Sequence, residues 1–188
     1  DPGVSSETLA LLQYTSGSTG TPRGVMVSHG NLLHNSSAIQ RVFGFTPDSL
    51  GLTWLPHYHD MGLIGGLLQP VYAGCPVIVM SPASFLQRPV RWLNAITRYR
   101  VSGIVAPNFA YDLCIRKIPL EQRSALKLDS VEAALCGAEP VRSKTLEQFA
   151  EAFGPCGFRR EAFRPAYGLA EATLLVSGHS RSSGAEVY

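Results

Sequence analysis

Short apolar runs alternate with amphipathic stretches along the chain, and turn-forming residues separate one segment from the next. Residues 9–14 (LALLQY) are an apolar run between turn residues, which is typical of a buried strand. Val90, Leu93 and Ile96 recur at helical spacing just after Pro89, a residue suited to a first helical turn. The same criteria predict strands over residues 25–27, 50–55, 76–80, 104–106, 131–136 and 163–167. They predict helices over residues 61–73, 108–116 and 143–153. A further helix begins after a cap at Ser28 or Asn31 and ends near residue 42.

Strands alternate with helices in this prediction, and most of the strands are apolar throughout. That pattern is typical of an α/β fold with a largely parallel sheet that helices cover on both faces. Such folds bind ligands in the loops that follow the carboxyl ends of the strands. Residues 15–24, 56–62, 137–140 and 167–173 each follow a predicted strand, so we expect these four loops to converge on one crevice.

Size and charge narrow the classes of function. The chain has 188 residues, which corresponds to about one domain with a sizeable core. Disorder is excluded, because 45% of the residues are hydrophobic and only 16% are charged. The net charge is +2, which provides no basic field, and we therefore expect no nucleic-acid partner.

The cysteines and the longest uncharged stretch bear on location. No two cysteines form a CxxC pair, so we expect reduced thiols and, from them, a cytoplasmic protein. Residues 61–87 carry no charge over 27 positions, but Pro70, Pro76 and Pro82 interrupt them. A membrane-spanning helix needs one long apolar run, so we predict a buried helix, a turn and a buried strand there, and no transmembrane segment.

Residues 15–24 (TSGSTGTPRG) have the composition of a phosphate-binding loop. They contain five hydroxyls, three glycines and one cation in ten positions. Glycine allows close approach of the backbone, free N–H groups and hydroxyls donate to phosphate oxygens, and Arg23 adds a fixed charge. The spacing is not that of a Walker A loop. A flexible surface turn is the alternative, but the position after a predicted strand favours phosphate binding.

Three motifs resemble those of one superfamily. Residues 14–25 (YTSGSTGTPRGV) resemble the AMP-binding signature of the adenylate-forming enzymes, which include acyl-CoA synthetases, nonribosomal-peptide adenylation domains and luciferases. Residues 56–63 (PHYHDMGL) resemble the second core motif of this superfamily, and residues 167–173 (YGLAEAT) resemble its Tyr-Gly-x-x-Glu motif. The resemblance covers roughly residues 9–176 and implies part of the large N-terminal AMP-binding domain, with residues 1–188 as a single partial domain.

The particular residues in these motifs resemble those of one branch of the superfamily, the fatty acyl-AMP ligases. The branch resemblance rests on residues 58–66 (YHDMGLIGG), 81–92 (SPASFLQRPVRW), 106–113 (APNFAYDL) and 167–173. It implies activation of a fatty acid with ATP and Mg²⁺ to acyl-adenylate, with release of pyrophosphate. The acyl group would then pass to the phosphopantetheine thiol of an acyl carrier protein of polyketide or lipid biosynthesis.

The resemblance also assigns nucleotide-binding residues. Arg23 stands where many members have lysine, and either residue can offset phosphate charge. Tyr167, followed by Gly168, resembles the aromatic residue beside the adenine. The segment that lines the adenine face corresponds to Gly137, Ala138 and Glu139, for which a plain turn is the alternative. The residues that would hold the phosphates are Thr15, Ser16, Gly17, Ser18, Thr19, Gly20 and Thr21.

Two further residues are implied in the chemistry itself. Glu171 matches the glutamate that binds Mg²⁺, a cation that favours carboxylate oxygens. His59 corresponds to a position at the mouth of the acyl tunnel, near the reacting carboxylate; two histidines, His57 and His59, are too few for a closed zinc site. Asp60 either orients His59 or caps the next helix. That helix, residues 61–73, either lines the tunnel, with Gly62, Gly65 and Gly66 leaving room for the chain, or packs as ordinary core.

Other parts of the superfamily's architecture have no counterpart in these residues. The chain begins without Met or a signal peptide, and we expect a piece of a longer protein. The ribose-binding aspartate, the hinge and the catalytic lysine of the C-terminal domain are not found, so we expect the 188 residues alone to be poorly active. The alternatives are a long-chain fatty acid CoA ligase, an amino-acid adenylation domain, or a non-catalytic module that binds a nucleotide or a lipid.

Overall fold

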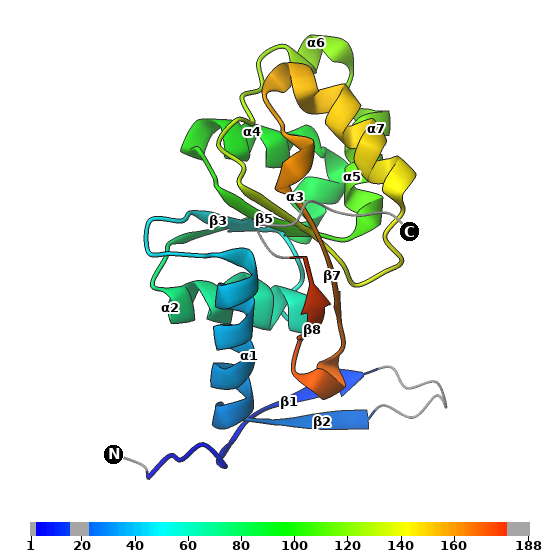
Figure 1. Ribbon diagram of the computed structural model, residues 1–188. Helices are drawn as coiled ribbons and strands as arrows, with labels where there is room; N and C mark the ends of the chain where they lie inside the picture. The colour runs from blue at the N-terminus through cyan, green and yellow to red at the C-terminus, as the bar shows by residue number, and fades with distance from the viewer. Residues whose placement is uncertain (1–2, 16–22, 180–188) are drawn as a thin grey trace.

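A six-stranded sheet organises the molecule (Figure 1). The computed structural model describes residues 3–15 and 23–179. The strand order is β4-β3-β5-β6-β7-β8; the first five strands are parallel, and β8 is antiparallel to β7 at the edge. This confirms the expected largely parallel sheet. The strands are β3 (Gly51–Thr53), β4 (Val77–Val79), β5 (Gly103–Ala106), β6 (Ala133–Cys136), β7 (Phe163–Gly168) and β8 (Leu175–Gly178).

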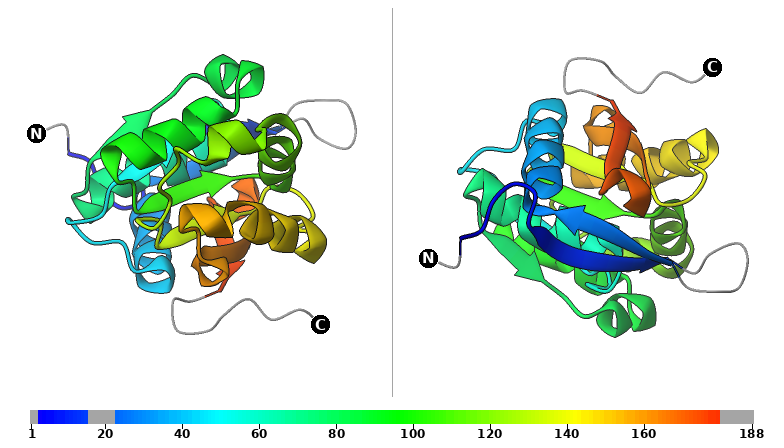
Figure 2. Two further views of the ribbon diagram at one scale, coloured as in Figure 1. Left: turned by 90° about the horizontal axis from the view of Figure 1, so that it is seen from above. Right: turned by 90° about the horizontal axis from the view of Figure 1, so that it is seen from below.

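Helices cover both faces of this sheet, as the apolar strands predict. In Figure 1, α4, α5 and α7 lie above the sheet, and α1 and α2 lie below it. Views from above and below show the same two layers (Figure 2). The α-helices are α1 (His29–Phe43), α2 (Gln69–Ala73), α3 (Pro82–Gln87), α4 (Val90–Tyr99), α5 (Asn108–Lys117), α6 (Leu120–Arg123) and α7 (Ser143–Phe153); a π-helix, η1 (Met61–Leu68), precedes α2, and short 3₁₀ turns are η2 (Gly154–Cys156), η3 (Arg160–Ala162) and η4 (Ala170–Ala172).

Aromatic side chains fill the core above the sheet. Trp54 stacks on Phe85 with ring centroids 4.0 Å apart, and the edge of Trp92 meets Phe85 at 5.5 Å. Tyr111 and Phe149 continue this cluster between α5 and α7, at 5.1 Å. Stacked and edge-to-face pairs of this kind add to the stabilisation that area burial already provides. The layer above the sheet is therefore tightly packed. The cavity described below lies on the other face of the sheet.

The first predicted strand forms where expected but is not buried. β1 (Leu9–Thr15) pairs antiparallel with β2 (Arg23–Ser28), and together they form a separate two-stranded sheet. Tyr14 is 64% exposed and Met26 is 71% exposed. The prediction of a buried strand over residues 9–14 is wrong, because an apolar run reports strand propensity but not what packs against the strand.

The helix predicted over residues 61–73 is one helical segment with two geometries. Its first part, η1, is a π-helix of eight residues, and its last part is α2. It ends at Gly74, whose left-handed φ of 72° gives the glycine C-cap that the sequence predicts. The short helices α3 and α6 and the edge strand β8 were not predicted.

Two further findings concern the cysteines and the membrane. All four cysteines are free thiols, as expected, and burial raises the pKa of Cys136 to about 12.

Within residues 3–15 and 23–179, no helix combines the length and the apolar character that crossing a bilayer requires.

Candidate active site

The sheet topology creates a crevice between two neighbouring strands. After β3 the chain turns to the lower face and enters η1, whereas after β5 it turns to the upper face and enters α5. Loops diverge at such a switch point and leave space for a ligand. A cavity of about 450 Å³ lies here, and residues of β3, β5 and η1 line it. The fold therefore places this cavity where the doubly covered sheet predicts a ligand site.

The mouth of this cavity gathers residues from all four loops expected to converge. Thr15 comes from β1, His59 from the segment after β3, Gly137 and Ala138 from the turn after β6, and Glu171 from the turn after β7. Tyr167 and Gly168 line it as well. The expected convergence is thus found for those loop residues that the structure describes. The prediction for Ser16, Gly17, Ser18, Thr19, Gly20 and Thr21 lies outside the described residues.

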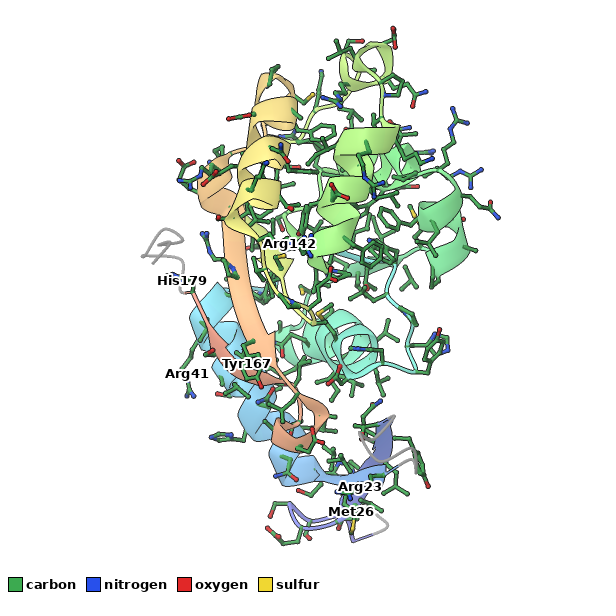
Figure 3. The ribbon with its side chains drawn as sticks, turned by 90° about the vertical axis from the view of Figure 1, so that its right-hand side faces the viewer. Arg23, Met26, Arg41, Arg142, Tyr167 and His179 are labelled. Carbon is green, nitrogen blue, oxygen red and sulfur yellow. The ribbon has the colours of Figure 1, made fainter. Side chains whose placement is uncertain are left out.

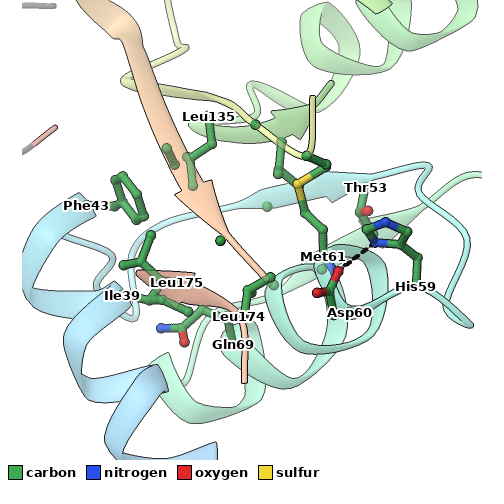
Figure 4. Close-up of a pocket in the computed structure, with 18 of the residues that line it drawn as sticks. Ile39, Phe43, Thr53, His59, Asp60, Met61, Gln69, Leu135, Leu174 and Leu175 are labelled. Carbon is green, nitrogen blue, oxygen red and sulfur yellow. Dashed lines mark hydrogen bonds and ion pairs between the residues drawn. The ribbon is translucent and has the colours of Figure 1, made fainter. Parts of the chain in front are cut away.

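The inner part of the cavity is mainly apolar (Figure 4). Met61, Gly65 and Gly66 of η1 line it, and Ile64 of the same helix is fully buried, so this helix both lines the cavity and packs in the core. The other apolar residues drawn and labelled there come from α1, β6 and the segment around β8: Ile39, Phe43, Leu135, Leu174 and Leu175. A long apolar chain that entered at the mouth would lie along the lower face of the sheet.

The glycines of η1 serve different purposes. A Cβ at Gly66 would lie 2.8 Å from Oγ1 of Thr53, so the missing side chain lets the helix approach β3 closely. Gly62 is not in the cavity lining; a Cβ there would overlap the backbone carbonyl of Pro56. The expectation that Gly62 leaves room for an acyl chain is therefore wrong, because this residue instead allows the tight entry into the π-helix.

His59 and Asp60 form a pair at the mouth. Nδ1 of His59 lies 2.7 Å from Oδ1 of Asp60, and the backbone N–H of Met61 donates to the same oxygen at 2.6 Å. The same N–H also lies 3.2 Å from Nδ1 of His59. The contact of Nδ1 with the carboxylate is the shorter one, and a carboxylate only accepts hydrogen bonds, which favours a proton on Nδ1 and leaves Nε2 for a ligand. The hydrogen bond with Asp60 raises the pKa of His59, although partial burial acts in the opposite direction. Asp60 thus fills both roles left open by the sequence: it orients His59 and caps η1.

Glu171 projects from a turn that a buried amide holds in place. Asn35 of α1 is only 7% exposed. Its Nδ2 donates to the carbonyls of Leu175 and Ala172 at 2.9 and 3.3 Å, and its Oδ1 accepts from the N–H of Leu175 at 3.0 Å. These bonds tie the turn that carries Glu171 to α1 across about 140 residues of sequence. Glu171 itself is exposed and lines the cavity.

Whether Glu171 fits Mg²⁺ depends on what else can coordinate the ion. No three His, Cys, Asp or Glu side chains lie close enough to hold a metal among the residues that the structure describes. Mg²⁺ in nucleotide sites is held by one or two carboxylates, with waters and phosphate oxygens as the other ligands. A single exposed carboxylate at the mouth is compatible with that arrangement, which needs no protein cage.

The turn after β6 has a strained backbone. Ala138 has a φ of 65°, which is uncommon for a residue with a side chain. A Cβ at Gly137 would lie 2.7 Å from the carbonyl oxygen of Ala166, so only glycine fits beside β7. Gly137 and Ala138 both line the cavity, and side chains this small leave room for a planar base beside the backbone.

Comparison with known proteins agrees with this geometry. Residues 1–186 match the family of AMP-binding enzymes. The chain belongs to this family. It is 55% identical over 186 residues to a medium-chain-fatty-acid–[acyl-carrier-protein] ligase of Moorena producens, in a match that covers 99% of this chain and 31% of that protein. A ligase of the same description from Teredinibacter turnerae is 45% identical over 181 residues, covering 96% of this chain and 28% of that protein.

A solved structure extends the comparison to three dimensions. The fatty acyl-adenylate ligase of Legionella pneumophila, in complex with acyl adenylate and pyrophosphate, matches with a TM-score of 0.92 and 52% identity. The match covers 96% of this chain and 32% of that one. This AMP-binding chain thus spans about 30% of the length of the relatives that it matches, and its fold is that of the corresponding part of these ligases.

Two residues assigned to nucleotide binding do not line the cavity of this AMP-binding chain. The carboxylate of Glu139 accepts a hydrogen bond of 2.6 Å from the backbone N–H of Phe109, and so caps the N-terminus of α5. Its assignment to the adenine face stays a prediction. Arg23 is exposed at the start of β2, where its Cα pairs with that of Thr15 at the mouth (Figure 3).

Sequence reasoning missed two polar residues of the site. Asn35 carries no motif, and its role depends on contacts made 140 residues away. Gln69 lies inside the long uncharged stretch and lines the cavity. A glutamine among apolar residues was the available signal, because a buried polar side chain usually has a partner or a purpose.

Proposed function

We propose that the whole protein activates a fatty acid with ATP to form an acyl-adenylate and pyrophosphate. The observation that carries this proposal is the cavity: its interior is mainly apolar, and its mouth holds Thr15 of the first motif, His59 of the second, and Tyr167 and Glu171 of the third. A fatty acid has the matching shape, with an apolar chain and a carboxylate at one end. The similarity to fatty acyl-adenylate and fatty-acid–carrier-protein ligases supports the same reaction.

The reaction needs little covalent help from the protein. An oxygen of the fatty carboxylate attacks the α-phosphorus of ATP, a new C(O)O–P bond forms, and the bond to the β-phosphate oxygen breaks with its electron pair leaving on pyrophosphate. The residues present position the two substrates and offset charge. Nε2 of His59, oriented by Asp60, donates to the carboxylate when protonated, and Thr15 and Arg23 stand beside the segment assigned to the phosphates.

We assign the nucleotide and the metal to the residues at the mouth that come from the turns after β6 and β7. Gly137 and Ala138 would support the adenine, with Tyr167, 61% exposed, beside it and Gly168 next in the turn. Glu171 would hold Mg²⁺ together with phosphate oxygens. When bound, Mg²⁺ neutralises charge on the phosphates. The role of Ser16 to Thr21 in holding the phosphates and the cytoplasmic location remain predictions from the sequence.

The acceptor of the acyl group is proposed to be an acyl carrier protein. The relative at 55% identity and one at 45% are named as ligases that use this acceptor, whereas other relatives at 45% are named as putative fatty-acid–CoA ligases. The higher identity of the first favours the carrier protein over coenzyme A. The test incubates the whole protein with labelled fatty acid, ATP, Mg²⁺ and either coenzyme A or a phosphopantetheinylated carrier protein, and resolves the products. Acyl-adenylate that persists with coenzyme A but is consumed by the carrier protein is the expected result. Conversion to acyl-CoA would contradict the acceptor but keep the adenylation step, and no adenylate would contradict the function.

A further inference from the structure

The acyl cavity extends under the sheet from the carboxyl ends of the strands to their amino ends. His59 and Glu171, at the mouth, come from the segments that follow the carboxyl ends of β3 and β7. The lining also includes the first residues of three neighbouring parallel strands: Gly51 of β3, Val77 of β4 and Gly103 of β5. The inner end of the cavity therefore lies at the amino edge of the sheet, opposite the mouth. In Figure 4, Phe43 lies toward this inner end and His59 on the opposite side.

One loop contacts both walls of the cavity at this inner end. Residues 44–50 connect α1 to β3, and Phe45 of this loop lines the cavity. On the side of the sheet, a Cβ at Gly103 would lie 2.8 Å from Cε1 of Phe45, so the ring lies directly against the start of β5. On the side of the helix, a Cβ at Gly74, the C-cap of α2, would lie 3.9 Å from Cγ of Pro47. The loop thus extends from the sheet to the end of the helix that forms the other wall.

Hydrogen bonds hold this loop in shape. Nε2 of Gln40 donates to the carbonyl of Phe45 at 3.2 Å. The N–H of Thr46 donates to Oγ of Ser49 at 3.1 Å, and the N–H of Ser49 donates back to the carbonyl of Thr46 at 2.9 Å. Residues 46–48 are exposed, so the loop is the outer surface of the described structure at this point. A fixed loop, and not a mobile tail, therefore places the Phe45 ring at the inner end.

We infer that Phe45 is a specificity-determining residue that limits the length of the acyl chain by closing the inner end of the cavity. A chain whose carboxylate lies at the mouth extends toward the amino edge of the sheet, and its last carbons meet the ring. A methylene beyond the available length can be accommodated only by displacing packed side chains, which is unfavourable. This inference rests on the proposed function, because that function places the carboxylate at the mouth.

The test measures pyrophosphate release by the whole protein with straight-chain saturated acids of 6 to 16 carbons, in steps of two. In the wild type, kcat/KM should fall by at least about tenfold across one step, because one methylene too many in an apolar pocket is worth about 10-fold to 200-fold. This fall marks the longest chain that fits. In Phe45→Ala the fall should occur at least one step later, while the shorter acids keep their kcat/KM.

Two further variants show whether the effect belongs to the size of this ring. Phe45→Trp carries a larger ring, so it should move the fall to a shorter acid than in the wild type. Phe109→Ala makes the same truncation at an exposed position of α5 that is not part of the cavity lining. This control should leave the length limit where it is in the wild type.

The outcomes separate this inference from the function on which it rests. A wild type without a length limit, or a limit that Phe45→Ala leaves in place, overturns the role of Phe45 and leaves adenylation intact. An equal loss of kcat/KM for every acid in Phe45→Ala has the same meaning, because the ring would then only support the fold. If Phe45→Ala does not fold, Phe45→Leu decides in its place, since its smaller apolar side chain should also move the limit to longer acids. No release with any acid by the wild type contradicts the proposed function itself.

Discussion

Asp60 controls the protonation state of the imidazole at the mouth of the cavity. It lies 2.7 Å from Nδ1 of His59, with 12% of its side chain exposed against 52% for His59. The carboxylate fixes the proton on Nδ1 and favours the charged form of the ring, which raises the pKa of His59. A charged imidazole at the mouth attracts a carboxylate. The pair therefore suits the binding of a fatty acid more than the removal of a proton.

Replacing Asp60 by asparagine tests this effect at the scale of one residue. The Asp60→Asn side chain would keep an oxygen for the N–H of Met61 but would lose the charge, so the pKa of His59 should fall toward the ordinary value of about 6.5. The ring proton of His59, assigned by its loss in His59→Gln, reports the pKa by NMR titration of the whole protein. Asp48→Asn, at an exposed carboxylate away from the mouth, is the matched control. An unchanged titration in Asp60→Asn would contradict the assignment.

The same pair predicts the direction of a pH effect on stability. Because folding raises the pKa of His59, its contribution to the free energy of unfolding is complete below the unfolded-state pKa and is lost as the pH rises through the folded-state value. The contribution is small, since the imidazole is about half exposed. Urea unfolding at a series of pH values measures it, and Asp60→Asn should flatten this part of the pH dependence.

At the scale of elements, the close contact of η1 with β3 shapes the cavity. Gly66→Ala should destabilise the protein by about 1–3 kcal/mol, because the new methyl would lie 2.8 Å from Oγ1 of Thr53 in a packed layer. It should also raise the KM for the fatty acid, since η1 would move relative to the cavity. The measurements are the midpoint of urea unfolding and the kinetics of pyrophosphate release.

Gly154→Ala provides the control for this prediction. A Cβ at Gly154 would meet nothing within 4 Å, and its backbone is helical, so alanine should change the stability by less than about 0.5 kcal/mol. Equal effects of the two substitutions would mean that the contact between η1 and β3 is loose, and the described packing of the cavity wall would be wrong.

The elements differ in how far the sequence predicts them. The apolar runs of β5 and β6 and the amphipathic α4 were predicted, because their burial follows from local pattern. The edge strand β8 was not, since it forms by pairing with β7 after a turn that Asn35 holds from α1. The start of η1 also depends on a contact, the close approach of Gly62 to the backbone of Pro56.

At the scale of the whole molecule, the sequence predicted that the sheet is largely parallel and that four loops after its strands converge. The mouth of the cavity lies where these loops meet. The motif residues His59, Tyr167 and Glu171 meet there as expected. The orientation of single side chains was not predictable. Glu139 caps α5, and Gln69 is buried beside the cavity, because tertiary contacts decide which way each points.

The central claim is that one cavity holds the acyl chain under the sheet and the adenylate at its mouth. The most direct test is a crystal structure of the whole protein with a non-hydrolysable analogue of an acyl-adenylate. We predict the acyl chain between β3, β5 and η1, the carboxylate-derived group near Nε2 of His59, and the adenine against Gly137 and Ala138. An acyl chain outside this cavity, for example on the exposed apolar side chains of β1 and β2, would contradict the account.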